Sequence, residues 1–276
     1  MKHRLDQYLV DQGLSESREK AKRAIIAGKV KVNGHRAKKP SDPIRDTDKI
    51  EVATPEKFVS RGGYKLERAL DQFDIDVTDL VAADLGASTG GFSDCLLQRG
   101  AKTVYAIDVG KGQLAWALRQ DPRIVVMEKV NARHLQPAQM PQPFAGVELV
   151  VIDCSFISLT KILPTATKLL VPGGRIVALI KPQFEAGKAA VDAGKGVIRD
   201  PEIHHQVVET LKAFVRNELH LNWIDITESP ILGPAGNKEF LCLIGTPNAT
   251  DQANRTYRQS GEASLEGESR PSSDPD

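Results

Sequence analysis

The chain has 276 residues, of which 41% are hydrophobic and 26% are charged, and this is an ordinary composition for a globular protein of one or two domains. No apolar run approaches the roughly 18 residues of a membrane-spanning helix, and the start MKHRLDQYLV lacks the apolar segment of a secretory signal. The 3 cysteines are odd in number and have no CxxC spacing. We therefore expect a cytoplasmic protein with buried free thiols, without disulfides, a zinc site or a membrane partner.

The net charge of +1 is unevenly distributed along the chain. Residues 1–51 hold 13 Lys and Arg against 8 Asp and Glu, a balance of +5, so the other residues carry −4. A small basic module beside a nearly neutral one favours a nucleic-acid partner for the first. A basic surface that is merely solvated would have the same charge.

The basic segment contains a compact set of predicted elements. RLDQYLVDQG has apolar residues at helical spacing and a stop at Gly13, and SREKAKRAIIAG predicts a second helix, which Ser15 or Ser17 caps and Gly28 ends. VKVNGHRA predicts a hairpin, because Asn-Gly is a strong turn pair, and DKIEV predicts a further strand.

Two short helices followed by a hairpin resemble the S-four-like RNA-binding domain of ribosomal small-subunit proteins. The resemblance rests on RLDQYLVDQGLSESREKAKRAIIAGKVKVNG and implies a small α+β domain over residues 1–53. A row of cations on a helix and a hairpin can span the phosphates of a folded RNA. The residues expected to bind RNA are Arg4, Arg18, Lys20, Lys22, Arg23, Lys29, Lys31 and Arg36.

Residues 54–60 are predicted to be a linker, and residues 61–247 to be a second domain. In that domain apolar strands alternate with helices, starting with LVAADLG and ending with the two strands NWIDITESPI and KEFLCLIGT. This alternation predicts an α/β fold whose mostly parallel sheet is covered on both faces, with the last strand antiparallel. Residues 248–276 are rich in Ser, Gly, Glu and Asp, and we expect them to be disordered.

A glycine-rich loop, DLGASTGGF, follows the first strand of the second domain. It is neither a P-loop nor GxGxxG, and Asp84 precedes it. A second acid, Asp108, ends the next strand 24 residues after Asp84, where a carboxylate can accept both ribose hydroxyls of an adenosine ligand. An NAD site and a plain strand-to-helix turn are the alternatives.

The pattern D-x-G-x-x-x-G with an acid after the second strand resembles class I S-adenosylmethionine-dependent methyltransferases. The resemblance implies a Rossmann-like, mostly parallel seven-stranded sheet with one antiparallel strand, and S-adenosylmethionine as the cofactor. Asn131 follows the third strand, where such folds meet the adenine, and Arg133 is a second candidate there. The expected cofactor-binding residues are Asp84, Gly86, Ser88, Thr89, Gly90, Gly91, Phe92, Asp108 and Asn131.

Four ionisable residues stand where this fold performs chemistry. Asp153 and Lys181 end apolar strands, Lys65 lies in the helix that enters the domain, and Glu239 opens the last strand. An ionised group at the end of a buried strand needs a partner, although each alone can be a solvated strand end. The expected catalytic residues are Lys65, Asp153, Lys181 and Glu239.

The order Lys–Asp–Lys–Glu resembles the FtsJ-type RNA 2′-O-ribose methyltransferases, and SRGGYKLERAL matches their entry motif. VIDCSFISL and LIKPQFEAGK, behind an S-four-like domain, resemble the TlyA/hemolysin A subfamily of ribosomal RNA methyltransferases. The resemblance implies 2′-O-methylation of a cytidine in ribosomal RNA and ribosomal subunits as partners. An RNA-binding or assembly protein with an inactive methyltransferase fold, a pore-forming hemolysin and a pseudouridine synthase are the alternatives.

A ribose hydroxyl must lose or share its proton to attack a sulfonium methyl in line. We expect Lys181 to accept that proton and Asp153 to orient it, while Lys65 and Glu239 hydrogen-bond the ribose. KPQFEAGKAAVDAGKGVIRD is read as a lid, an RNA contact or a connector. His204 and His205 are expected at the surface, and Trp116 and Trp223 in a core or an interface.

Overall fold

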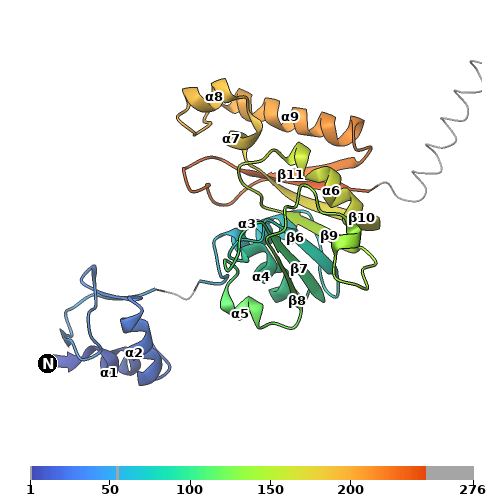
Figure 1. The fold of residues 1–276 in the computed structure, drawn as a ribbon. Helices are drawn as coiled ribbons and strands as arrows, with labels where there is room; N and C mark the ends of the chain where they lie inside the picture. The colour runs from blue at the N-terminus through green and yellow to red at the C-terminus, as the bar shows by residue number, and fades with distance from the viewer. Residues whose placement is uncertain (1, 54–55, 247–276) are drawn as a thin grey trace, which may run out of the picture. The chain divides into compact units, whose positions relative to one another are not determined.

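The computed structural model describes residues 2–53 and 56–246, which divide into two compact units, Met1–Lys57 and Phe58–Asp276. Figure 1 shows the helices and strands of each unit. The boundary falls inside the predicted linker, because Phe58 is buried in the core of the second unit. The segment predicted to be disordered, 248–276, lies outside the described residues.

The first unit has the helices and the hairpin that the sequence predicts. Ser17 caps the second helix by accepting a hydrogen bond from the Lys20 amide at 3.3 Å. Asn33 and Gly34 have φ values of 51° and 79°, the left-handed conformation that a tight hairpin turn requires. The elements are β1 (Lys2–Arg4), α1 (Leu5–Asp11), α2 (Arg18–Ile26), β2 (Val30–Val32), β3 (His35–Arg36), β4 (Pro43–Arg45) and β5 (Ile50–Val52).

The packing of the first unit explains which residues remain outside. Leu5 and Leu9 of α1 meet Ala21 and Ile25 of α2 in a small core, because these residues recur at helical spacing. Strand β1 pairs with β4, and β2 pairs with both β3 and β5. The cationic side chains of α2 and the hairpin are thereby left on the surface.

The second unit is built on a seven-stranded sheet with the order β11-β12-β10-β9-β6-β7-β8. Strand β12 runs antiparallel to both its neighbours, while β6 to β10 pair in parallel, which confirms the predicted sheet. The strands are β6 (Val81–Leu85), β7 (Thr103–Asp108), β8 (Ile124–Glu128), β9 (Val147–Ile152), β10 (Leu170–Ile180), β11 (Asn222–Glu228) and β12 (Phe240–Gly245).

Helices cover both faces of this sheet, as Figure 1 shows. Successive strand residues point to opposite faces, so Val150 packs with α6 and α9 while Val151 packs with α3, α4 and α5. The helical elements are α3 (Gly62–Gln72), α4 (Gly91–Gln98), α5 (Trp116–Arg119), η1 (Pro137–Gln139), η2 (Leu159–Lys161), α6 (Leu163–Leu169), α7 (Pro182–Glu185), α8 (Lys188–Ala193) and α9 (Pro201–Asn217).

The expectation of a surface position was wrong for His204, and of the two positions expected for Trp116, a core or an interface, the structure excludes the core. His204 is buried, because it lies on the apolar stripe of α9 with Val207 and Val208, and its Nε2 is 3.0 Å from the carbonyl oxygen of Ile198. Trp116 is 75% exposed, since it opens the short helix α5, in which Leu118 takes the buried position. Among the described residues, no helix is long and apolar enough to cross a membrane.

Candidate active site and RNA-binding surface

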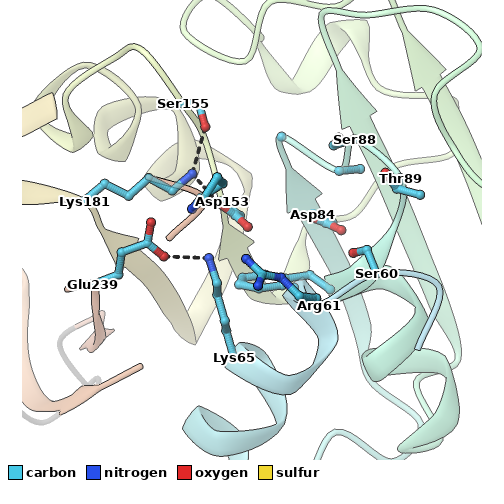
Figure 2. Close-up of a pocket in the computed structure, with 16 residues that line it drawn as sticks. Ser60, Arg61, Lys65, Asp84, Ser88, Thr89, Asp153, Ser155, Lys181 and Glu239 are labelled. Carbon is cyan, nitrogen blue, oxygen red and sulfur yellow. Dashed lines mark hydrogen bonds and ion pairs between the residues drawn. The ribbon is translucent and has the colours of Figure 1, made fainter. Parts of the chain in front are cut away.

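The four residues expected to be catalytic line one pocket of about 510 Å³ at the carboxyl edge of the sheet. Two parallel strands deliver Asp153 and Lys181 to this edge, and the antiparallel β12 delivers Glu239, which immediately precedes the strand. Lys65 reaches the same pocket from α3. The sequence separates these residues by up to 174 positions, and the fold brings them together (Figure 2).

The four side chains form two ion pairs. Lys65 Nζ lies 2.6 Å from Glu239 Oε2, and Lys181 Nζ lies 2.5 Å from Asp153 Oδ1. Lys181 also donates to Ser155 Oγ at 2.9 Å, as Figure 2 shows. Each buried lysine therefore has an acidic partner that offsets part of its desolvation.

The glycine loop lies on the other side of the same pocket. Gly86, Ser88, Thr89, Gly91 and Phe92 line it together with Asp84, whereas Gly90 does not. Gly90 has a φ of +98°, and a Cβ there would lie 2.3 Å from Leu118 Cδ1. Gly90 thus serves the packing of the loop on α5, because a side chain would collide with that helix.

A second pocket of about 470 Å³ adjoins the first, because Gly86, Ser88, Asp153 and Ser155 line both. The predicted adenosine contacts Asp108 and Asn131 line this second pocket. The expected site residues of the second unit therefore follow one continuous groove, except Gly90 and the candidate Arg133, which line neither pocket.

The carboxylate of Asp108 already accepts two backbone amides. Its Oδ2 accepts from Ser88 at 2.8 Å, and its Oδ1 accepts from Gly110 at 2.7 Å. A carboxylate oxygen has two lone pairs, so each oxygen keeps one for a ligand hydroxyl. The amides fix the carboxylate at the end of β7 before a ligand arrives.

Asp84 is fully buried below the glycine loop. Its Oδ2 accepts from the amide and the hydroxyl of Ser93 at 3.0 and 2.7 Å, while its Oδ1 has no hydrogen-bond partner among the described residues. Burial raises the pKa of Asp84 to about 7, against the lowering effect of Ser93. A buried oxygen without a donor is a ready acceptor for a cationic ligand group.

The titration of Asp84 gives a stability prediction for the cofactor-free protein. Because its folded pKa lies near 7 and its unfolded pKa near 4, the proton stabilises the fold at low pH, and this contribution is lost as the pH rises toward 7. We expect Asp84→Asn to gain stability relative to wild type, by about 2–4 kcal/mol, between pH 4 and pH 8. Urea unfolding followed by tryptophan fluorescence measures this.

The exposed Asp192 provides the control for that experiment. Asp192→Asn should show no such pH-dependent gain, because its carboxyl group stays in water in both states. A difference between Asp84→Asn and wild type that is independent of pH would contradict the prediction. Both tryptophans of the chain, Trp116 and Trp223, lie in the second unit, so their fluorescence follows the unit that carries Asp84.

The thiol nearest to the catalytic residues is unsuited to covalent catalysis. Cys154 lines the second pocket, and its Sγ donates to the Leu85 carbonyl at 3.4 Å. Burial, together with the negative charge of the neighbouring Asp153, raises the pKa of this thiol to about 12. A nucleophilic cysteine needs a thiolate, so Cys154 does not fit that role.

Several residues that line the two pockets were not predicted from the sequence. Ser60 and Arg61 stand directly before the recognised helix, and Ser155 follows Asp153, so proximity to a motif could have pointed to them. Pro234 comes from the loop before β12 and carries no sequence pattern. Phe156 is 90% exposed at the mouth of the second pocket with a φ of 63°, a backbone conformation that apolar periodicity cannot predict.

The eight cations predicted to bind RNA fall into two groups. Arg4 and Arg18 both donate to the buried Asp6, and although burial raises its pKa, their hydrogen bonds hold the pKa of Asp6 below its usual value. Lys20 pairs with Glu16 and Lys22 with Glu19. The side chains that make no ion pair with other described residues are Arg23, Lys29, Lys31 and Arg36.

Arg36 of that second group is fixed against the end of α2. It donates to the Ile26 carbonyl at 3.3 Å, and a Cβ on Gly28 would lie 2.2 Å from its Cζ. A cation beside the last carbonyls of a helix is favourable there. Its guanidinium is thereby placed beside the exposed Arg23 and Lys29 at the same helix end.

Comparison with family models decides the membership of the chain. Residues 58–246 match the FtsJ-like methyltransferase model, and residues 3–50 match the S4 domain model. The chain belongs to the FtsJ-like methyltransferase family.

Individual relatives of this FtsJ-like methyltransferase cover nearly its whole length. The 16S/23S rRNA (cytidine-2′-O)-methyltransferase TlyA of Mycobacterium tuberculosis is 44% identical over 91% of both chains. YqxC of Bacillus subtilis, a candidate rRNA methyltransferase, is 49% identical over 89% of this chain and 86% of its own. The structure of a candidate hemolysin from Streptococcus thermophilus has a TM-score of 0.67 and 42% identity, covering 95% of this chain and 98% of its own.

Proposed function

We propose that the protein is an S-adenosylmethionine-dependent 2′-O-ribose methyltransferase that modifies a cytidine of ribosomal RNA. The observation that carries the proposal is the pair of lysine–acid contacts, Lys65–Glu239 and Lys181–Asp153, in one pocket with the glycine loop. The printed activity of the Mycobacterium tuberculosis relative supports the reaction and the substrate class.

The groove fits the proposed cofactor in shape and charge. Gly86 has a φ of +88° and lies so close to the Asp153 carbonyl that a Cβ would come within 2.8 Å of its oxygen, so only a glycine fits at this point of the groove. The unpartnered Oδ1 of Asp84 suits an ammonium group, and the remaining lone pairs of Asp108 suit ribose hydroxyls. S-adenosylmethionine would supply an electrophilic methyl group next to Asp153.

The catalytic residues then act on the ribose hydroxyl of the RNA. In this proposal the Lys181 ammonium first releases a proton to water, and the resulting amine then accepts the hydroxyl proton, while Asp153 and Ser155 hold its nitrogen in place. General-base assistance of this kind contributes about 10²–10⁴-fold to a rate. Lys65 and Glu239 hold each other in the same pocket, where their remaining hydrogen-bonding capacity positions the ribose.

Two features support RNA as the substrate that enters this pocket. Phe156 is 90% exposed, and its ring centroid lies 5.1 Å from that of Phe184, which follows Lys181 by three residues. Exposed aromatic faces beside a catalytic site suit the stacking of an unpaired nucleobase. The S4 domain supplies the cations that hold the surrounding RNA through its phosphates.

Incubation with radiolabelled S-adenosylmethionine and separated ribosomal subunits tests the proposed function. We expect label in ribosomal RNA, at a cytidine whose 2′-oxygen has become resistant to alkaline cleavage. Methylation of a base would overturn the proposed reaction. Absence of both methylation and cofactor binding would instead favour an RNA-binding protein with an inactive methyltransferase fold.

The unpaired cations of the first unit lead to a prediction about RNA binding. Replacing both Arg23 and Lys31 by alanine should lower the slope of log affinity against log salt by about 2, because each lost phosphate contact removes about one unit. Filter binding of ribosomal RNA over a salt series measures it. Lys49, which is exposed and pairs with Glu51 at 2.7 Å, provides the control, and an unchanged slope in the double variant would contradict the assignment.

A further inference from the structure

Three loops carry catalytic side chains on the substrate side of the pocket. The first follows β9 and holds Asp153, the second follows β10 and holds Lys181, and the third precedes β12 and holds Glu239. The contacts of Lys181 with Asp153 and Ser155 join the first two loops, but Glu239 pairs with Lys65 of α3, so no catalytic contact joins the third loop to them. Two further side chains supply the contacts that the catalytic residues do not make.

Glu185 joins the first loop to the second. Its carboxylate accepts from Ser158 Oγ at 2.6 Å and from the Leu159 amide at 2.8 Å. Glu185 lies four residues after Lys181, and Ser158 lies five residues after Asp153. Burial raises the pKa of Glu185, against the lowering effect of its two donors. The contact requires that both carboxylate oxygens of Glu185 accept a hydrogen bond.

Asn237 joins the third loop to the chain that continues from the second. Its side chain is 1% exposed, its Oδ1 accepts from the Ile198 amide at 2.8 Å, and its Nδ2 donates to the Gly196 carbonyl at 3.0 Å. These two backbone groups, one donor and one acceptor, determine the orientation of the amide. The buried Ile198 also meets His204 Nε2 through its carbonyl, so this segment is anchored to α9.

Backbone hydrogen bonds around Asn237 couple its position to that of Glu239. The Asn237 carbonyl accepts from the Gly233 amide at 2.9 Å, and the Glu239 carbonyl accepts from the Ser229 amide at 2.9 Å. Gly233 packs directly on the catalytic carboxylate, since a Cβ there would lie 2.5 Å from Glu239 Oε1. A shift of Asn237 would therefore move Gly233, which packs on the Glu239 carboxylate, and the backbone of Glu239 itself.

We propose that Glu185 and Asn237 are positioning residues, which fasten the three loops so that Asp153, Lys181 and Glu239 keep their arrangement around the ribose. The inference rests on the proposed function. Neither residue lines the catalytic pocket, so both act through the residues they hold. Residues 196–198 are consequently a fixed support of the site, which disfavours a freely moving lid at that part of the 186–200 segment.

Two isosteric substitutions remove the contacts with little change in volume. Glu185→Gln turns one acceptor into a donor and so keeps one of its two hydrogen bonds, and Asn237→Asp loses the donor that faces Gly196. We expect kcat for RNA methylation to fall about 10–100-fold in each variant, since displacement of a catalytic group by about 1 Å costs this much. The Kd for S-adenosylhomocysteine, measured by calorimetry, should stay at the wild-type value.

Glu148 provides a matched control. Its carboxylate accepts from the Val81 amide at 2.8 Å, but it lies at the start of β9, at the opposite edge of the sheet. Glu148→Gln should keep the wild-type kcat. A wild-type kcat in both Glu185→Gln and Asn237→Asp would overturn the proposal, and so would a fall of kcat in proportion to the loss of cofactor affinity, which marks general damage.

Hydrogen–deuterium exchange tests the two contacts without methylation. The Leu159 amide donates to Glu185 and the Ile198 amide to Asn237, so peptides that contain them should exchange faster in the corresponding variant. Unchanged exchange would show that the side chains do not hold the loops. If the wild-type protein methylated no RNA, the proposed function would fail, while the exchange result would still decide whether these contacts fix the loops.

Discussion

Lys181→Met is expected to slow RNA methylation by about 10²–10⁴-fold, because it removes the amine proposed to accept the hydroxyl proton. The Lys181 side chain is largely buried, and methionine retains most of its apolar stem, so the fold should be kept. Single-turnover methylation of ribosomal RNA gives the chemical rate. Calorimetry with S-adenosylhomocysteine should show cofactor binding of wild-type strength.

Lys102 provides the control for that substitution, since it is an exposed lysine just before β7, at the edge of the sheet away from the pocket. Lys102→Met should methylate RNA at the wild-type rate. A normal single-turnover rate in Lys181→Met would remove Lys181 from the role of proton acceptor. The two lysine–acid pairs would then serve to bind the substrate.

Breaking the buried pair of Lys65 and Glu239 should have the largest effect on stability. The two side chains are 8% and 1% exposed, so Lys65→Met or Glu239→Gln alone leaves one charge buried without its partner. We expect each single variant to lose about 3–5 kcal/mol of unfolding free energy. The double variant should regain most of that loss, because neither charge remains, yet it should stay inactive.

Urea unfolding followed by tryptophan fluorescence measures these differences in the second unit. The exposed pair Glu228 and Lys238 provides the matched comparison, and the same substitutions there should change stability little. Strictly additive losses in the Lys65→Met/Glu239→Gln double variant would contradict the coupling of the two charges. Recovered activity in that variant would remove both residues from the reaction.

The sheet could be predicted from the periodicity of its strands, and the meeting of Asp153 and Lys181 at one edge could be predicted from their positions at strand ends. Asp153 and Lys181 end buried strands, and parallel strands end at one edge, so their proximity follows from the fold. Lys65 came from the family resemblance alone. Its partner Glu239 was assigned to the ribose, and the contact between these two side chains depends on a helix-to-strand distance that the sequence does not contain.

The other features that we did not predict depend on which residues meet in the folded chain, and the local sequence pattern alone did not lead us to them. A glycine motif does not tell which glycine faces the ligand, and Gly90 faces Leu118 instead. The helical spacing of His204 with Val207 and Val208 did contain the information that places it in the core. Asn237 could not have been found, because its partners Gly196 and Ile198 lie about 40 residues earlier in a segment without periodicity.

The antiparallel direction of β12 has a practical consequence. Because Glu239 begins this strand at the pocket, the strand ends at the opposite edge, where Gly245 pairs with Arg175 and the Thr246 amide donates to Gly174. A fluorophore or capture group attached at position 246 itself therefore lies at the edge of the sheet away from the groove. Immobilising the protein through that position should keep the groove open to ribosomal subunits in surface-based binding measurements.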